Sequence, residues 1–485
     1  MDISDSVLGL VSVALVGAIV GRGLTYLLNF VIADGLGPEA VGVFAFGMTV
    51  MNVGAIVSKA GIDGAVAKLI PIYENERSDT HIAGTILFAI AFSTIIGVVF
   101  AVGIVLASKL DIGLLSQSTS GLYVFAFSIP ILAVLRVGTR ASQGFKETKY
   151  AVYTRDLLRP TTAIVLATIG AYLLMDIKYV IFGYAFSLLV AVGGIILFLT
   201  YQGAFSGLSA PSVEATRAIG LALPMFMANL GRYFTFWTDV LMLGIFVQAS
   251  ELGKYQIAYQ TTLVLTFILA ATNSLFPSLV AGLYDDGQME RLQKVFTTTV
   301  KWIVYFTGFG YLFLVVYANN ILTIFGPAFA EAAVPMIILA TAQFIGACVG
   351  PAGFMLTMSE HERIELVNSL FTAALNAVLN LILIQQFGIL GAAIATATAI
   401  AFLNILRLAE VNYLLGMFPY SRRLLPGVGL LTVTSFIMYS AQWLPLSGIR
   451  LLLVAGFGSA GVFLVGAWVF AIDESDDILI ESLDI

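Results

Sequence analysis

Two arginines stand in stretches of the chain that are otherwise apolar. Residues 21–26 read GRGLTY, and the related segment GRYFTF begins 210 residues later, with Arg22 and Arg232 in the same place. A charge at the centre of a membrane-spanning helix costs roughly 2.5–3.5 kcal/mol on insertion scales, so its presence points to a polar function. The forked donors of a guanidinium match phosphate oxygens. The pair predicts an anion-binding cavity between two similar helix bundles; the alternative is a buried ion pair, for instance with Asp239.

Helical spacing places further polar side chains on the faces of the two arginines. The first face carries Arg22, Tyr26 and Asn29, and the second carries Asn229, Arg232 and Asp239. We predict that these residues contact the substrate, with one exception. Asp239 either orients the second arginine or accepts a coupling proton or sodium ion.

Polar residues also share faces on the next helix of each bundle. Asn52, Lys59 and Asp63 line up in the first bundle, and Gln256 and Gln260 lie one turn apart in the second. We predict Lys59 and both glutamines as substrate contacts, and Asp63 as a second ion-coupling candidate. The alternative for Lys59 is a lysine that extends to the nearby inner membrane surface.

The composition indicates what must position these side chains. The 485 residues are 59% hydrophobic and 11% charged, with a mean hydropathy of +0.98, whereas soluble domains carry roughly 25% charged residues. Apolar runs of about 20 residues recur along the chain, too long for barrel strands. We therefore predict an all-α polytopic membrane protein with about fourteen transmembrane helices. They are 8–32, 40–61, 82–107, 122–137, 157–174, 180–201, 218–247, 255–281, 295–318, 332–356, 366–385, 389–415, 424–443 and 449–471.

The distribution of basic residues predicts the orientation. With the N-terminus in the cytoplasm, sixteen of the 23 Lys and Arg residues lie on or near the inner side and four outside. The other three, Arg22, Lys59 and Arg232, lie within helices. This asymmetry favours an even number of helices with both termini cytoplasmic, and a first helix that is retained rather than cleaved as a signal peptide.

An internal repeat predicts the domain organisation. Gly42-Val43-Phe44 has a counterpart in Gly253-Lys254-Tyr255, six helices later, so the two copies have the same orientation and form a parallel repeat. The predicted parts are a first lobe (1–201), a cytoplasmic linker (202–217), a second lobe (218–415), two further helices (416–471) and an acidic cytoplasmic tail (472–485). The net charge of −6 suits a prokaryotic, haloarchaeal source, although a solvated acidic tail alone explains it as well.

Several chemistries are excluded or unsupported. One cysteine rules out a disulfide framework, and the two histidines are expected in loops as solvated residues rather than metal ligands. No G-x-x-x-x-G-K-[ST] loop occurs, and the glycines at 456, 458 and 461 are explained by helix packing. The stripe of Asn368, Thr372, Asn376 and Asn380 is expected to hold helices together. We expect no enzyme activity, no cofactor, no metal and no nucleic-acid partner.

Three segments give the chain a family resemblance. They are GLGPEAVGVF at 35–44, ASQGFK at 141–146 and FGPAF at 325–329. With these, the chain resembles the polysaccharide transporter family (Wzx-type flippases) of the multidrug/oligosaccharidyl-lipid/polysaccharide exporter superfamily, which also contains lipid II flippases and MATE exporters. The resemblance implies a MATE-like, two-lobed transporter. Such a transporter flips lipid-linked oligosaccharides across the cytoplasmic membrane by alternating access, and Arg22 and Arg232 match its phosphate-binding cations.

The resemblance also implies the surroundings of the reaction. The carrier would be a polyprenyl or dolichyl phosphate or pyrophosphate, and the product would serve cell-surface polysaccharide or glycoprotein glycan assembly. Membrane lipids and glycan assembly enzymes are the expected partners. Two alternatives stay open: an ion-coupled MATE-like small-molecule exporter, which would favour acidic cavity residues, and a membrane glycan polymerase or ligase, which would need a larger outer loop.

Overall fold

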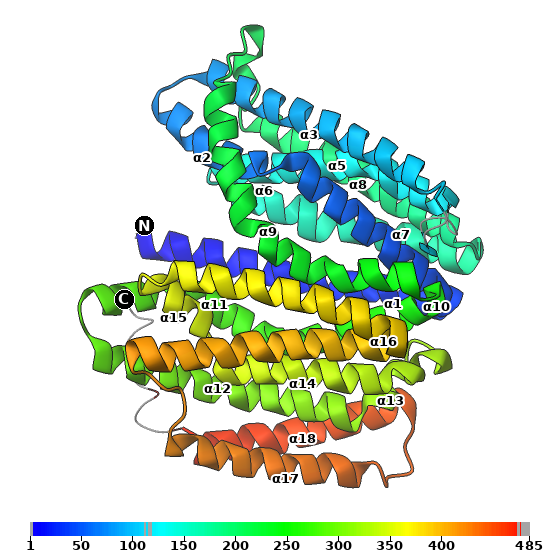
Figure 1. Ribbon diagram of the computed structural model, residues 1–485, viewed down its shortest axis with the longest axis vertical. Coiled ribbons are helices and arrows are strands. Elements are labelled where there is room, and N and C mark those ends of the chain that lie inside the picture. The colour runs from blue at the N-terminus through cyan, green and yellow to red at the C-terminus, as the bar shows by residue number, and fades with distance from the viewer. Residues whose placement is uncertain (1–2, 111–112, 115–118, 473–475, 477–485) are drawn as a thin grey trace. The chain divides into compact units, whose positions relative to one another are not determined.

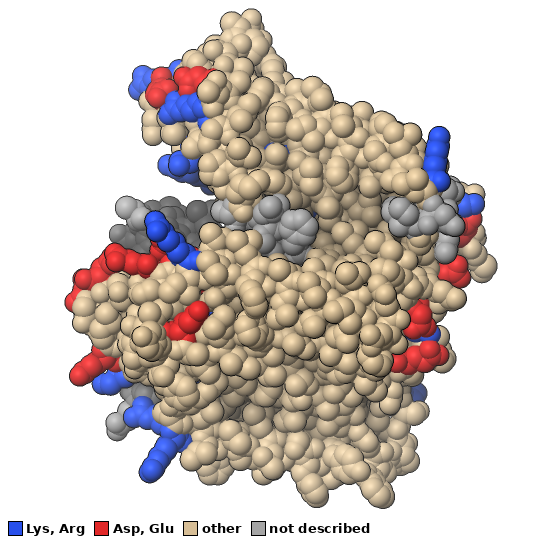
Figure 2. All heavy atoms as spheres, viewed as in Figure 1, with Lys and Arg blue, Asp and Glu red and all other residues tan. Residues whose placement is uncertain are grey.

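The computed structural model describes residues 3–110, 113–114, 119–472 and 476 (Figure 1). Within these ranges, the side chains of 3–16, 18, 119–120, 228–236, 274–275 and 278 lie outside the description. The described residues are almost entirely helical and contain no strand, which confirms the all-α fold. Figure 2 shows broad uncharged surfaces, with the charged side chains gathered toward the ends of the helices, as expected for segments that cross a membrane.

The chain divides into two compact units, Met1–Gly253 and Lys254–Ile485. The first unit contains α1 (Ile3–Lys59), α2 (Ile62–Asn75), α3 (Asp79–Ala107), α5 (Thr119–Gly144), α6 (Thr148–Val152), η1 (Tyr153–Leu158), α7 (Arg159–Thr168), η2 (Ile169–Leu173), α8 (Ile177–Tyr201), η3 (Ser206–Ser209) and α9 (Ala215–Phe246). The helix α10 (Ala249–Thr262) crosses the division between the units. The structure divides after Gly253, so α9 packs within the first unit. The lobe boundary at 202–217 comes from the internal repeat and stays a prediction.

The second unit continues with a similar set of helices. It contains η4 (Leu263–Thr266), α11 (Phe267–Asp285), α12 (Met289–Val316), α13 (Ala318–Thr323), η5 (Pro327–Ala332), α14 (Ala333–Val349), α15 (Ala352–Met358), α16 (Glu362–Leu415), η6 (Arg422–Leu424), α17 (Leu425–Ala441) and α18 (Gly448–Phe470). The described residues include nine helices long and apolar enough to cross a membrane. Two of these, α1 and α16, are broken at Gly37 (φ 79°) and Gly388 (φ 57°) and each holds two predicted spans, so the helices are consistent with about fourteen crossings.

Glycines set the approach of α1 to the fifth predicted span, which consists of α6, η1, α7 and η2. A Cβ on Gly17 would lie 2.3 Å from the Val152 side chain, and one on Gly21 would lie 3.1 Å from Asp156. Small residues at such crossings let two helices approach closely in a membrane. The turn of α1 that carries Arg22 is therefore fixed directly beside Asp156.

The second predicted span is interrupted where α1 gives way to α2. Ala60 and Gly61 both have positive φ, at 40° and 83°, and a Cβ on Gly61 would lie 2.2 Å from the carbonyl oxygen of Ala222 in α9. A positive φ strains a residue with a side chain, so Ala60 is held there by its surroundings. The break lets α9 approach at the same point at which Lys59 and Asp63 face each other.

The polar stripe on α16 joins its two halves, as predicted. Asn368 Nδ2 donates to Glu410 Oε2 at 2.6 Å, and Asn376 Nδ2 donates to Thr396 Oγ1 at 3.2 Å. All four residues of the stripe are buried, and Asn368 and Asn376 make the hydrogen bonds between the two halves, whereas Thr372 Oγ1 has no hydrogen-bond partner and Asn380 Nδ2 donates to Asn376 O of its own half.

The linker after α8 is fastened to the start of α3. Ser212 N donates to Thr80 O at 3.0 Å, and Ser206 Oγ donates to Asp79 Oδ2 at 3.0 Å. Tyr73 OH donates to Glu214 Oε2 at 3.1 Å. We call this set of contacts the linker clasp.

Both histidines are half-buried rather than solvated. His81 lies in the first turn of α3, with Nδ1 2.7 Å from Ser78 Oγ, and His361 precedes α16, with Nδ1 3.2 Å from Ser359 Oγ. The predicted loop position was wrong for His81, which lies in a helix, and correct for His361, which lies in the loop before α16; each ring packs beside the serine of its own turn. The described residues contain no group of three His, Cys, Asp or Glu side chains arranged to hold a metal ion.

Candidate functional site

The predicted face of α1 divides into an exposed and a buried part. Arg22 is exposed and Tyr26 is half-buried, whereas Asn29 is buried. Asn29 Nδ2 donates to the carbonyl oxygen of Thr25 at 2.9 Å, and Thr25 Oγ1 donates to Gly21 O at 2.8 Å. Asn29 thus bonds to its own helix, while Arg22 and Tyr26 extend from the turn that packs beside Asp156.

The corresponding face of α9 is only partly described. The side chains of Asn229 and Arg232 lie outside the described set, so their predicted contacts stay predictions. Asp239 is buried two turns further along α9. Its roles as an orienting group or an ion-coupling group both stay open.

The structure brings Lys59 and Asp63 together as a buried ion pair. Lys59 Nζ lies 2.5 Å from Asp63 Oδ2, and Arg140 Nε lies 3.9 Å from the same oxygen. The pair bridges the break at Ala60 and Gly61. Removing either partner would leave a buried charge without compensation. The ion pair therefore stabilises the broken helix, whether or not Lys59 also contacts a substrate.

Four arginines counted on or near the inner side lie within helices of the first unit, two of them inside the spans predicted at 122–137 and 157–174 and two beyond these predicted spans. They are Arg136, Arg140, Arg155 and Arg159. Arg136 Nη2 donates to Asn52 Oδ1 at 2.5 Å, which explains the polar position on the second span. The sequence signal that would have found them is helix length: α5 runs to Gly144, seven residues beyond its predicted end, and the fifth span begins at Thr148 rather than 157.

Unpaired amide groups mark the second unit. The side-chain oxygens of Gln256 and Gln260 on α10, and of Asn273 on α11, are buried without a hydrogen-bond partner. A buried acceptor left unpaired costs about 1–3 kcal/mol, so such groups call for a donor from a ligand or water. The two glutamines predicted from the sequence are thus together, and Asn273 is a residue the sequence analysis missed.

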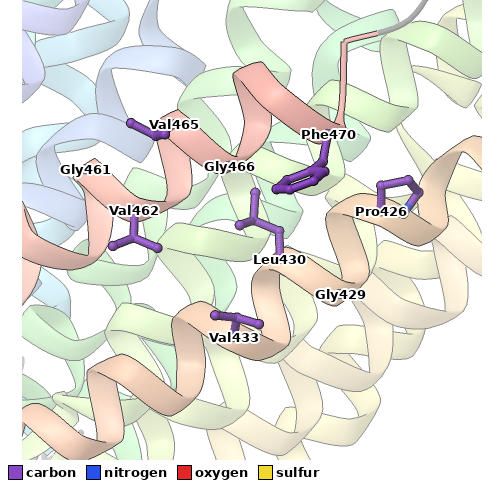
Figure 3. Close-up of a pocket in the computed structure, with 9 residues that line it drawn as sticks. All are labelled: Pro426, Gly429, Leu430, Val433, Gly461, Val462, Val465, Gly466 and Phe470. Carbon is purple, nitrogen blue, oxygen red and sulfur yellow. The ribbon is translucent and has the colours of Figure 1, made fainter.

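Two apolar cavities also lie in the second unit. One, of about 710 Å³, is a groove between α17 and α18, lined by nine residues among which Leu430, Val462 and Phe470 point toward one another (Figure 3). The other, of about 460 Å³, lies between α12, α14 and α17 and includes Tyr311, Phe344 and Tyr420. Both are lined mainly by apolar groups that would accommodate hydrocarbon.

The fold is similar to those of two membrane transporters of known structure. The structure is similar to the lipid II flippase MurJ in an inward closed conformation, with a TM-score of 0.71 and 14% identity over 94% of this chain and 98% of that one. It is also similar to an inward-facing multidrug resistance MATE family transporter, with a TM-score of 0.67 and 15% identity over 81% of this chain and 94% of that one. These similarities define the MATE-like fold.

Residues 8–282 match the family model described as polysaccharide biosynthesis protein, and the chain belongs to this family. It is 26% identical over 435 residues to the probable low-salt glycan biosynthesis flippase Agl15 of Haloferax volcanii, covering 87% of this chain and 86% of that protein. It is also 25% identical over 205 residues to the probable flippase AglR of the same organism, covering 40% of this chain and 42% of that protein.

Proposed function

We propose that this protein is a flippase that moves a lipid-linked oligosaccharide across the cytoplasmic membrane by alternating access. The observation that carries the proposal is the similarity to a probable glycan flippase along most of both chains, on the fold of a lipid II flippase. The excess of arginine within the helices of the first unit supports an anionic substrate. A polyprenyl or dolichyl phosphate or pyrophosphate carrier has this charge.

We propose that Arg22 and Arg232 hold the carrier phosphate, with Tyr26 and Asn229 beside them. A guanidinium binds phosphate through two parallel hydrogen bonds, which gives direction as well as charge. Asn29, bonded to Thr25, supports the shape of the α1 turn. Lys59 serves the phosphate only if Asp63 releases it, so its main role is the ion pair.

The glycan end of the substrate would meet the second unit. Gln256 and Gln260 present buried oxygens without donors, and sugar hydroxyls are donors of the right kind. Asp239 and Asp63 are the proposed ion-coupling candidates; Asp63 lies beside the cationic groups of Lys59 and Arg140.

The proposed setting is a prokaryotic cytoplasmic membrane with both termini on the inner side. The acidic net charge and the Haloferax relatives support a haloarchaeal source. Membrane lipids and glycan assembly enzymes are the proposed partners. The predicted lobes 1–201 and 218–415, the linker between them, the helices at 416–471 and the tail at 472–485 complete the proposed organisation.

The second candidate function is an ion-coupled small-molecule exporter, which the similarity to MATE transporters favours. The two functions differ in the charge of the cargo. An exporter of cationic compounds would need carboxylates where the first unit places arginines.

Transport in proteoliposomes tests the proposal. A labelled dolichyl- or undecaprenyl-linked oligosaccharide is expected to cross with wild-type protein and to stall with Arg22→Gln or Arg232→Gln. Arg450→Gln, an exposed residue of α18, is the matched control and should transport normally. Thermal unfolding verifies that each variant is folded. Glycolipid transport by both folded Arg→Gln variants at the wild-type rate would contradict the site, and failure of wild type on every carrier, with export of cationic dyes, would favour the second function.

A further inference from the structure

The fifth predicted span has an unusual geometry. Its ordinary helical turns alternate with two π-helical turns, η1 at Tyr153–Leu158 and η2 at Ile169–Leu173. Ordinary α-helix has 3.6 residues per turn, and a π turn is wider, so side chains four residues apart come close to one line. Short π-helical insertions within helices occur frequently at functional sites.

One such line begins with two arginines and continues into the interior of the first unit. It consists of Arg155, Arg159, Ala163, Ala167 and Ala171. The three alanines are each 1% exposed, so this line faces into the helix bundle.

The neighbouring lines of the same span are occupied by other helices. Thr154 and Leu158 face Gly194 of α8, while Val152 and Asp156 face Gly17 and Gly21 of α1. The arginine line thus lies between α1 and α8. Along this line the exposure falls from the exposed Arg155 through the half-buried Arg159 to the buried alanines.

The segment from Arg155 to Arg159 carries more positive than negative charge. Arg155 Nε and Nη2 donate to Asp156 Oδ1 and Oδ2 at 2.8 and 2.7 Å, a bidentate pair. The side chain of Arg155 is nonetheless 45% exposed, whereas that of Asp156 is 13% exposed.

Arg159 adds a second cation without a carboxylate of its own. It is half-buried, and its Nε is buried with no hydrogen-bond partner. Among the residues that the structure describes it has no ion pair. The segment therefore carries two permanent cations and one carboxylate, which Arg155 occupies, and the buried Nε–H of Arg159 is left for a ligand to satisfy.

We propose that Arg155 and Arg159 form an oxyanion site of the phosphate class within the first unit, beside the α1 turn that carries Arg22. Asp156 occupies the fork of Arg155 when the site is empty, and the anion displaces it while it also accepts a hydrogen bond from Arg159. The anion is either the phosphate of a lipid headgroup or free phosphate, which present the same oxygens. Binding here is separable from transport: a protein that binds phosphate but moves no glycolipid would refute the proposed function and leave this site standing.

Equilibrium binding of radiolabelled inorganic phosphate to the purified full chain, at constant ionic strength, tests the site. Arg155→Gln and Arg159→Gln are each expected to weaken binding by about tenfold or more, because each removes a charge-assisted donor. Asp156→Asn is expected to tighten binding by a few-fold, since the competing carboxylate is lost. Arg450→Gln should bind as wild type does.

The opposite response of Asp156→Asn separates a ligand site from a structural ion pair. A purely structural pair predicts lower thermal stability and no gain in phosphate affinity, and that result would overturn the proposal. Wild-type binding in both Arg→Gln variants would overturn it too. If Arg159→Gln does not fold, Arg159→Lys keeps the charge without the fork, and an affinity equal to that of wild type would count against the site.

A competition measurement identifies the source of the anion. Polyprenyl phosphate in nanodiscs that displaces the labelled phosphate assigns the site to a lipid headgroup. Displacement by free phosphate but not by the lipid assigns it to a soluble anion. Both results support the site, whereas displacement by neither would overturn it.

Discussion

Gly42 and Gly253, which the internal repeat aligns at an offset of 211 residues, meet each other within the first unit. A Cβ on Gly42 would lie 1.7 Å from Ala249 O and 3.0 Å from Gly253 N. A Cβ on Gly253 would lie 1.9 Å from Pro38 O and 2.9 Å from Gly42 N. Pro38 and Ala249 have the same offset, so the contact is reciprocal. Equivalent segments of a parallel repeat are expected to meet in this way.

Substitution of either glycine should destabilise the protein. Gly42→Ala places a methyl group against a backbone carbonyl that cannot turn aside, and overpacking of this kind costs about 1–3 kcal/mol. Thermal unfolding of purified protein measures the loss. Gly429→Ala in α17 is the control, because a Cβ there meets no atom within 4 Å and alanine favours helix. Equal unfolding temperatures for the two variants would contradict the close approach.

The Lys59–Asp63 pair predicts a large loss of stability when Asp63 is replaced alone. Replacing Lys59 as well should restore much of that stability. Asp63→Asn leaves Lys59 buried beside a neutral group, at a cost of about 3–5 kcal/mol, as for other broken buried pairs. The double variant Lys59→Met with Asp63→Asn should recover much of that loss, since no buried ammonium remains. Chemical or thermal unfolding of the three proteins gives the comparison. A double variant no more stable than Asp63→Asn would show that the charge is not what matters.

The linker clasp predicts a dependence on pH. Hydrogen bonds from Arg217 and from Tyr73 lower the pKa of Glu214 below its ordinary 4.5. The stabilisation is therefore present above that value and is lost as pH falls through the lower pKa of the folded state. Spin labels at Thr80 and Ser212, in a protein with Cys348 replaced by Ala, should separate as pH falls through this range. In Glu214→Gln the distance should no longer change with pH there, and an unaltered pH response would disprove the assignment to Glu214.

The tail residue Asp476 is bound rather than solvated, contrary to the simplest expectation for an acidic tail. It accepts from Lys301 Nζ at 2.8 Å and from Trp302 Nε1 at 2.8 Å, and Lys301 is 3% exposed. Asp476→Ala should lower stability by about 1–3 kcal/mol, because Lys301 and Trp302 each lose a hydrogen-bond acceptor. The fluorescence of Trp302 should change as well. Asp286→Ala, an exposed acidic residue, serves as the control and should alter neither quantity.

The sequence predicted the helices well because the chemistry of a membrane leaves few alternatives. A segment without water must pair its backbone internally, so a long apolar run predicts a helix. The ends of the helices were less predictable. The span predicted to end at 137 extends as α5 to Gly144, through Arg140, whose Nε lies 3.9 Å from Asp63 Oδ2.

The direction in which a side chain points was the second feature that the sequence could not predict. Asn29 shares the helical face of Arg22 by spacing, yet it bonds to Thr25 O one turn back. Amide side chains can bond locally in this way, and no periodicity distinguishes that from an outward direction. The π turns around Arg155 leave no recognisable signature in the sequence, so the interior line of the fifth span was found only in the structure.

The linker clasp has a mechanical consequence for α9. Ser212 is tied to Thr80 only three residues before α9 begins, so the N-terminal ends of α3 and α9 are coupled by a short tether. Any swing of α9 must therefore take place beyond the tether. Pro224 is the proline within α9, and because it supplies no backbone N–H, one helical hydrogen bond is missing there. The tether therefore holds the first turns of α9 against α3, and we expect α9 to bend at Pro224.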